Sequence, residues 1–242
     1  MQIEQTTHSR RPRITAIIPA FNEGRNLQAV LDVLRQSDLP DEIFLVDDGS
    51  QDNTFALMQS AAMSDARMKV FHHAKNRGKG QSIFTAWEAA SGTVILLLDA
   101  DLHELNPGHI RALLAPVLER KADMTLGLFH GGHPQTDFSS QGAPFLTGQR
   151  ALRADVMKHV SREAALGYGF EIALTVAANG RGYRIQKVPM FGVWHPPSEL
   201  HRGIWYGIKW RARMYAQILR ALFVSMQERH SWARTFFSSS PK

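Results

Sequence analysis

Two aspartates separated by one residue, Asp99 and Asp101, carry the clearest chemical signal in the sequence. They follow Thr93 to Leu98, the most hydrophobic strand-like run of the chain, which is typical of a buried strand. Two carboxylates at one strand end can reach a single hard cation, and Mg²⁺ or Mn²⁺ prefers such oxygen ligands. The pair therefore predicts a divalent-metal site completed by phosphate oxygens. His103 is a candidate third ligand, although a solvated loop position fits it equally well.

A second acidic motif, DDGSQD, begins at Asp47 and follows the apolar run Glu42 to Val46. A carboxylate at such a strand end can accept hydrogen bonds from a nucleobase N–H or a ribose hydroxyl. We assign this role to Asp48. For Ser50 and Asp52, turn and helix-cap chemistry is the preferred interpretation.

A third motif, Asn76-Arg77-Gly78-Lys79-Gly80, combines two glycines with two cations. Backbone N–H groups at Gly78 and the charge of Lys79 suit the binding of a diphosphate. The spacing is not that of a P-loop, and the chain contains neither a Gly-x-Gly-x-x-Gly motif nor a Gly-x-Ser-x-Gly elbow.

The elements that must position these motifs alternate between strand and helix. Apolar runs typical of strands occur at residues 14–18, 42–46, 69–71, 93–98 and 124–128, and residues with helical spacing separate them. The alternation predicts an α/β fold in which helices flank a parallel sheet. Each polar motif follows a strand, and such sheets bind ligands at the carboxyl ends of their strands.

Beyond residue 130 the alternation weakens. His130 to Pro144 is rich in Gly, Pro, Ser and His and predicts a long functional loop. The segments Leu152 to Val160 and Phe170 to Ala178 have patterns that predict helices.

The motifs together resemble the inverting glycosyltransferases of family 2, which have the GT-A fold. The resemblance rests on IIPAFNE, VDDGSQD, NRGKG and LLLDADL, whose order and spacing match over about the first 130 residues. It implies a GT-A-type, Rossmann-like, mostly parallel sheet flanked by helices. It also implies that Asp99 and Asp101 hold the metal and the diphosphate, with Ala100 beside the donor. The nucleoside pocket would be lined by Pro19, Ala20, Asn22, Glu23 and Asp48.

Within that family the chain is most similar to the polyprenyl-phosphate-using branch that includes dolichol-phosphate mannosyltransferases. Members of that branch carry a Gln where His103 stands here. The segments TGQRALR, from Thr147, and GYGFEIAL, from Gly167, resemble acceptor-side segments of the branch. The resemblance implies transfer of a sugar from a UDP- or GDP-linked donor to a polyprenyl phosphate.

The choice of acceptor decides which residues must act. An alcohol acceptor needs a general base, for which Glu171 and Asp155 are candidates. A phosphate acceptor is already an anion and needs cations instead, a role that suits Arg150 and, less well, Arg153. Ordinary surface charge is the alternative for each of these residues. A soluble acceptor and a nucleotide-sugar-binding module without turnover are the alternative functions.

The bulk composition limits the partners. The 242 residues include no cysteine, which excludes disulfides and thiolate metal sites. Of the net charge of +6, residues 201–242 contribute +7, because they hold eight Lys or Arg and one acid, so residues 1–200 sum to −1. A nucleic-acid partner is therefore not indicated. The polar first 12 residues do not resemble a signal peptide, and no apolar run approaches the roughly 20 residues of a membrane helix, so a cytoplasmic location is expected.

We expect four regions: a flexible arm at 1–12, the GT-A domain at 13–200, a basic amphipathic helical segment at 201–232 and a tail at 233–242. Apolar residues from Ile204 to Met226 fall on one helical face, most of the cations lie opposite, and three of the five Trp lie in this region. Such a helix suits peripheral contact with the inner face of an anionic membrane through residues 201–226. Packing on the domain or in a dimer is the alternative.

Overall fold

The computed structural model describes residues 11–132, 142–165 and 169–196, which fold around one seven-stranded sheet with the order β3-β2-β1-β4-β6-β5-β7. The strands are β1 (Ile14–Ala20), β2 (Glu42–Asp47), β3 (Met68–His72), β4 (Val94–Leu97), β5 (Met124–His130), β6 (Arg150–Arg153) and β7 (Ile185–Phe191). Every pairing is parallel except those of β6, which runs antiparallel to both β4 and β5.

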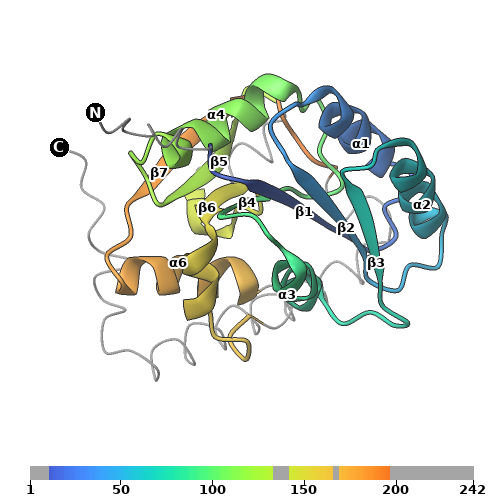
Figure 1. Cartoon of the computed structure of the whole chain (residues 1–242). Helices are drawn as coiled ribbons and strands as arrows, with labels where there is room; N and C mark the ends of the chain where they lie inside the picture. Colours follow the sequence, from blue (N-terminus) through green and yellow to red (C-terminus); the bar gives the residue numbers. More distant parts are fainter. Residues whose placement is uncertain (1–10, 133–141, 166–168, 197–242) are drawn as a thin grey trace, which may run out of the picture.

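Helices cover both faces of the sheet (Figure 1). One layer holds α1 (Leu27–Gln36), α2 (Thr54–Ser64) and α4 (Pro107–Leu118), and the other holds α3 (Lys79–Ala89) and α6 (Phe170–Gly180). Successive residues of the central strands alternate between the layers: Ile18 packs toward the first and Ile17 toward the second. A strand that is buried on both faces is largely apolar, which explains the hydrophobic run of β4 and that of β1, where only Thr15 is polar.

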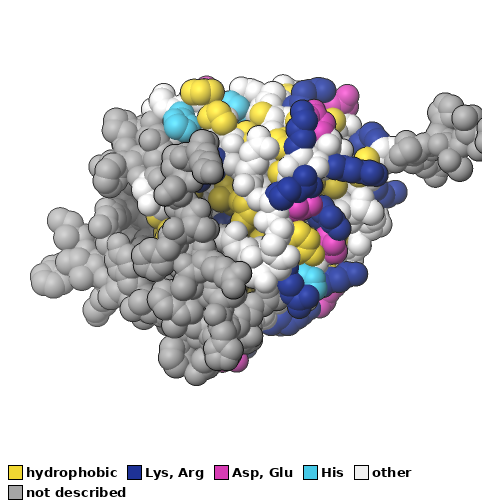
Figure 2. Space-filling model, turned by 90° about the vertical axis from the view of Figure 1, so that its left-hand side faces the viewer, with side chains coloured by type: hydrophobic (Ala, Val, Ile, Leu, Met, Phe, Trp, Pro, Cys, Tyr) yellow, Lys and Arg dark blue, Asp and Glu magenta, His cyan; other side chains and the backbone are white. Residues whose placement is uncertain are grey.

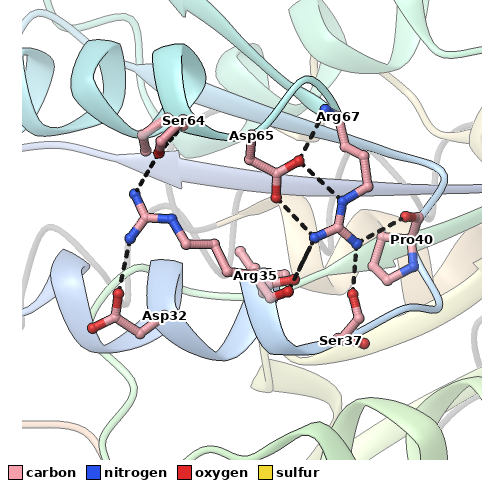
Figure 3. Close-up of polar contacts among 9 residues, drawn as sticks. Asp32, Arg35, Ser37, Pro40, Ser64, Asp65 and Arg67 are labelled. Carbon is pink, nitrogen blue, oxygen red and sulfur yellow. Dashed lines mark hydrogen bonds and ion pairs between the residues drawn. The ribbon is translucent and has the colours of Figure 1, made fainter.

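The first layer is fastened at the amino ends of the strands by Arg67, which lies between α2 and β3 (Figure 3). Its guanidinium donates to the carbonyl oxygens of Leu34 at 3.1 Å and Ser37 at 2.5 Å, at the end of α1. Asp65 holds the same guanidinium from the other side at 2.8 Å. Because the last carbonyls of a helix lack partners within the helix, this cation both caps α1 and ties it to the next element.

Most of the predicted elements are confirmed, and one is wrong. The strands expected from residue 14 to residue 128 and the helices between them are present, as is the helix over Phe170 to Ala178. The helix expected over Leu152 to Val160 is instead the end of β6 followed by two 3₁₀ turns, η2 (Ala154–His159). A shorter 3₁₀ turn, η1 (Pro144–Leu146), precedes β6. Pairing with strands on both sides has overridden the local pattern of β6.

Two further expectations concern residues outside the described ones. The amphipathic segment at 201–232 lies wholly outside them, as does most of the loop from His130 to Pro144. In the described ranges no helix has the length and hydrophobicity needed to cross a membrane. On the face drawn in Figure 2, Lys and Arg side chains are interspersed with Asp and Glu. The division into four regions stays a prediction.

Candidate active site

The parallel strands bring the polar motifs to one edge of the sheet. The carboxyl ends of β1 and β2 lie side by side, with Ala20 opposite Asp47, and β4 pairs with the other side of β1. Because β6 is antiparallel, its first residue, Arg150, lies opposite Leu97, at the end of β4. The edge therefore gathers the segments after β1, β2, β3 and β4 together with the segment that precedes β6, as the sequence predicts for the first four.

Asp99 lies in a network of charges that comes from three elements. Its Oδ1 is 2.5 Å from Lys79 Nζ at the start of α3, and its Oδ2 accepts a hydrogen bond from Gln149 Nε2 at 2.8 Å. Lys79 also lies 2.7 Å from the carboxylate of Glu171 on α6. Burial alone would raise the pKa of Asp99, but the charge and hydrogen bond of Lys79 outweigh it and hold that pKa below its usual value. Asp99 is therefore kept ionised.

The pKa values of Asp101 and Glu23 are raised, in contrast to that of Asp99. Burial raises the pKa of Asp101, and the charge of Asp99 raises it further. Burial likewise raises the pKa of Glu23 to about 7, with added repulsion from Asp101 and Asp99, although a hydrogen bond from Asn26 opposes the shift. Like charges that share a partly desolvated site disfavour one another's ionised forms. A cation bound between these side chains would relieve the repulsion.

Asp48 fastens the segment after β2 to the segment after β3. It accepts hydrogen bonds from the backbone N–H groups of Arg77 at 2.9 Å and Gly78 at 2.7 Å, and His73 Nδ1 lies 2.7 Å from it. Gly49 is required at this crossing, because its φ is 76° and a Cβ there would lie 2.6 Å from the backbone of Lys75. The N–H of Gly78, which the sequence assigns to a diphosphate, is thus committed to Asp48.

Pro19, Ala20 and Asn22 lie beside Asp48 at the end of β1. The N–H of Asp48 donates to Ala20 O at 2.9 Å. Asn22 adopts a left-handed backbone conformation, with φ of 58°, and exchanges hydrogen bonds with the DDGSQD loop through Ser50 Oγ and the N–H of Gln51. The residues expected to line a nucleoside pocket are therefore neighbours, although their contact with a nucleoside stays a prediction.

The ring of His103, a predicted metal ligand, contacts Trp194 and Asn26. Its ring stacks on Trp194, with centroids 4.4 Å apart, and its Nε2 lies 3.3 Å from Asn26 Oδ1. In the part of the chain that the structure describes, no three His, Asp or Glu side chains already form a ligand set for a metal. His195, which follows Trp194, acts electrostatically on both Asp99 and Asp101. No sequence motif marks His195, and only its place after β7 brings it to this edge.

Arg150 is at the site edge but beneath its surface. The side chain is fully buried and donates to the carbonyl oxygens of Thr147 at 2.8 Å and Phe145 at 2.7 Å and to Thr175 Oγ1 at 2.9 Å. Burial disfavours the charge and lowers the pKa of Arg150 to about 10. The predicted contact with an acceptor phosphate requires an exposed guanidinium, so this expectation needs correction: Arg150 supports the segment that carries Gln149.

Arg153 and Asp155 lie at the opposite end of the sheet. Arg153 is opposite Val94, the first residue of β4, and forms a surface ion pair with Asp155 at 2.7 Å. Their proposed roles at the acceptor were therefore wrong. Glu171 remains at the site, where its ion pair with Lys79 connects α6 to the Asp99 loop.

Residues 15–169 match the model of the family described as Glycosyl transferase family 2, and the chain belongs to this family. The predicted family resemblance is confirmed.

Several individual proteins are similar to this chain. It is 28% identical over 203 residues to the undecaprenyl-phosphate mannosyltransferase of Micrococcus luteus, covering 74% of this chain and 82% of that one. It is 26% identical to the dolichol-phosphate mannosyltransferase of Pyrococcus furiosus, covering 75% and 57%. A match to the glycosyltransferase GlyG of Streptococcus pneumoniae, at 31% identity, spans 48% of this chain and only 39% of GlyG.

Solved structures show the same fold. Glucosyl-3-phosphoglycerate synthase from Mycobacterium tuberculosis, in complex with Mn²⁺, UDP and phosphoglyceric acid, has a TM-score of 0.69 with this chain. The match covers 88% of this chain and 78% of that one at 22% identity. Another structure of the same synthase contains Mg²⁺ and UDP. At this identity the likeness establishes the fold alone.

Proposed function

We propose that this family 2 enzyme transfers a hexosyl group from a UDP- or GDP-linked sugar to a polyprenyl phosphate, with inversion, and that it uses Mg²⁺ or Mn²⁺. The observation that carries the proposal is the pair of carboxylates, Asp99 and Asp101, at the carboxyl edge of the sheet, with Lys79 beside them. The names of the undecaprenyl-phosphate and dolichol-phosphate mannosyltransferases among its relatives support the acceptor class.

The donor set at this edge fits a hard divalent cation. The carboxylates of Asp99 and Asp101, whose charges act on each other, would supply oxygen ligands, and the imidazole of His195 is a candidate for a nitrogen ligand because its charge acts on both. When bound, the cation would neutralise charge on the departing nucleoside diphosphate. We assign Asp99, Asp101 and His195 to the cation in place of His103.

The chain's own residues would do the rest of the work at the donor. We assign Pro19, Ala20, Asn22, Glu23 and Asp48 to the nucleoside, since they surround the ends of β1 and β2. Lys79 is the closest cation to Asp99 and would stabilise the diphosphate electrostatically, with Ala100 lining the same loop. Its ion pair with Glu171 holds the ammonium group at this place.

The acceptor determines the role of Glu171. A phosphate acceptor is an anion at neutral pH and needs no general base, so Glu171 would serve to position Lys79. A soluble sugar or a phosphorylated small molecule that offers a hydroxyl would need a base, and Glu171 is the only member of the two original candidates that lies at the site. A transfer assay that offers both acceptor types separates these roles.

Nucleotide binding provides the first test. We expect UDP or GDP to raise the unfolding temperature in the presence of Mn²⁺, and the shift to disappear in Asp101→Asn, because ligand binding to the folded state stabilises it by mass action. Asp155→Asn is the matched control, since Asp155 lies at the opposite end of the sheet. A wild-type protein that responds to neither nucleotide would contradict the proposal.

Acceptor specificity provides the second test. We expect transfer from the stabilising donor to a short polyprenyl phosphate and no transfer to soluble sugars. Contact with the membrane through residues 201–226, which lie outside the described residues, stays a prediction that co-sedimentation with anionic vesicles would examine.

A further inference from the structure

A short junction joins the loop after Asp101 to the segment after β7. The N–H of His103 donates to Trp194 O at 2.8 Å, and the N–H of Trp194 donates to His103 O at 3.3 Å. The two rings stack with an interplanar angle of 18°. His103 is two residues beyond Asp101 and Trp194 immediately precedes His195, so this junction places one candidate ligand segment against another.

The junction lies just beyond the end of β7, where the pairing with β5 stops. The register between β5 and β7 ends at His130 and Phe191. Gly192, with φ of 80°, then turns the chain, and its N–H donates to His130 O at 2.8 Å. The paired strands end there, and the bridge between Trp194 and His103 follows three residues beyond Phe191.

The side chain of His103 also contacts Asn26, which in turn binds Glu23. Its Nε2 faces Asn26 Oδ1 at 3.3 Å, and Asn26 Nδ2 donates to Glu23 Oε2 at 2.8 Å. A histidine binds a metal through a lone pair in the ring plane. One face of this ring is covered by the indole and its Nε2 edge is directed at Asn26, so the geometry favours a supporting role.

We propose that His103 and Trp194 are positioning residues, whose stacking and backbone bridge hold His195 against Asp99 and Asp101 and so set the affinity of the site for a divalent cation. The inference rests on the proposed function, because it presupposes a cation at those carboxylates. Side chains that orient metal ligands commonly change metal affinity by about 10- to 100-fold when removed. Phe129, whose ring lies edge-on at 5.7 Å from that of His195, supports the imidazole from β5.

Binding of Mn²⁺ in the presence of UDP or GDP, followed by the electron paramagnetic resonance signal of free Mn²⁺, tests the inference without an activity assay. We expect His195→Ala, Trp194→Ala and His103→Ala each to weaken Mn²⁺ binding by about tenfold or more. His103→Phe keeps a flat ring for the stack but has no metal-binding nitrogen. It should therefore bind Mn²⁺ within about threefold of the wild type.

Each result has one meaning. If His103→Phe bound Mn²⁺ as poorly as His195→Ala, His103 would be a ligand and the inference would be overturned. Unchanged binding by Trp194→Ala would overturn it as well. Trp87→Ala, which removes a tryptophan at the end of α3 away from this junction, controls for general loss of packing and should bind Mn²⁺ normally. A wild-type protein without Mn²⁺ binding would overturn the proposed function itself.

Discussion

The two ends of the parallel strands differ in the partners of several acidic side chains. At the amino ends, acidic side chains pair with arginines: Asp123 lies 3.1 Å from Arg184, and Asp41 lies 3.0 Å from Arg11. At the carboxyl ends, Glu23 has no cation partner among the ion pairs of the described residues, and Lys79 is shared between Asp99 and Glu171.

The pKa values follow this difference. Hydrogen bonds from Arg184 lower the pKa of Asp123 despite its burial, and hydrogen bonds from Thr15 and Ser91 overcome burial to lower that of Glu42. At the other edge, burial and mutual repulsion raise the pKa values of Glu23 and Asp101. Paired acids stabilise the fold as anions, whereas crowded acids destabilise it unless a ligand neutralises them. The comparison supports a structural role for the paired acids of the amino edge and the proposed binding role for the carboxyl edge.

The largest effect is expected from Arg150→Ala, which tests whether a cation at the binding edge can be structural. Removal leaves two backbone carbonyls and Thr175 without their donor and opens a cavity under the Gln149 segment. We expect the free energy of unfolding in urea to fall by about 3 kcal/mol. A loss below about 1 kcal/mol would mean that the buried network is replaceable by solvent.

The next largest effect is expected from Lys79→Met, which removes the shared positive charge but keeps a long side chain. Asp99 and Glu171 then repel each other, and the diphosphate loses its nearest positive charge. We expect affinity for UDP or GDP with Mn²⁺, measured by calorimetry, to weaken about tenfold or more, which equals about 1.4 kcal/mol. Lys121→Met, at an exposed pair with Glu119, is the control and should bind normally. Equal affinities in the two variants would refute the role of Lys79.

A smaller effect is expected from Glu23→Gln and depends on pH. The folded-state pKa of Glu23 is raised from 4.5 to about 7, so its stabilising contribution is complete below pH 4.5 and is lost as the pH rises through 7. Gln does not ionise. Above pH 7, the free energy of unfolding of the metal-free variant should therefore be higher than that of the wild type by about 1 kcal/mol, after allowance for solvent screening. The two proteins should converge below pH 5. A constant difference across thermal unfolding curves from pH 5 to 8 would contradict the raised pKa.

The smallest effect is expected from Arg153→Ala, on the same strand as Arg150. Its side chain is 49% exposed and pairs with the exposed carboxylate of Asp155, and at 3.3 Å with Asp123, which Arg184 also holds. Such pairs contribute at most about 1 kcal/mol, and added salt should reduce the difference in urea unfolding between variant and wild type. If Arg153→Ala lowered the free energy of unfolding as much as Arg150→Ala, the expected difference between the two arginines would be wrong.

The local pattern of the sequence was sufficient for the strands and helices up to residue 130 and for the edge at which the site lies. Continuous apolar runs identify strands such as β1 and β4, and parallel strands necessarily present their carboxyl ends together. Asp48, Asp99 and Asp101 each follow such a run, so their place in the fold was predictable. Lys79 was predictable as a donor-side cation, but its two carboxylate partners were not.

Only the tertiary structure decided the remainder, because it depends on contacts between residues far apart in the chain. The antiparallel insertion of β6 places Arg150 at the binding edge and Arg153 at the opposite one, although a pattern of two nearby arginines cannot tell them apart. In the same way, the bridge between His103 and Trp194 joins the loop after Asp101 to the segment that contains His195, a contact that no local pattern predicts. Hydrophobic periodicity records which face of an element is buried, but not which distant element covers it.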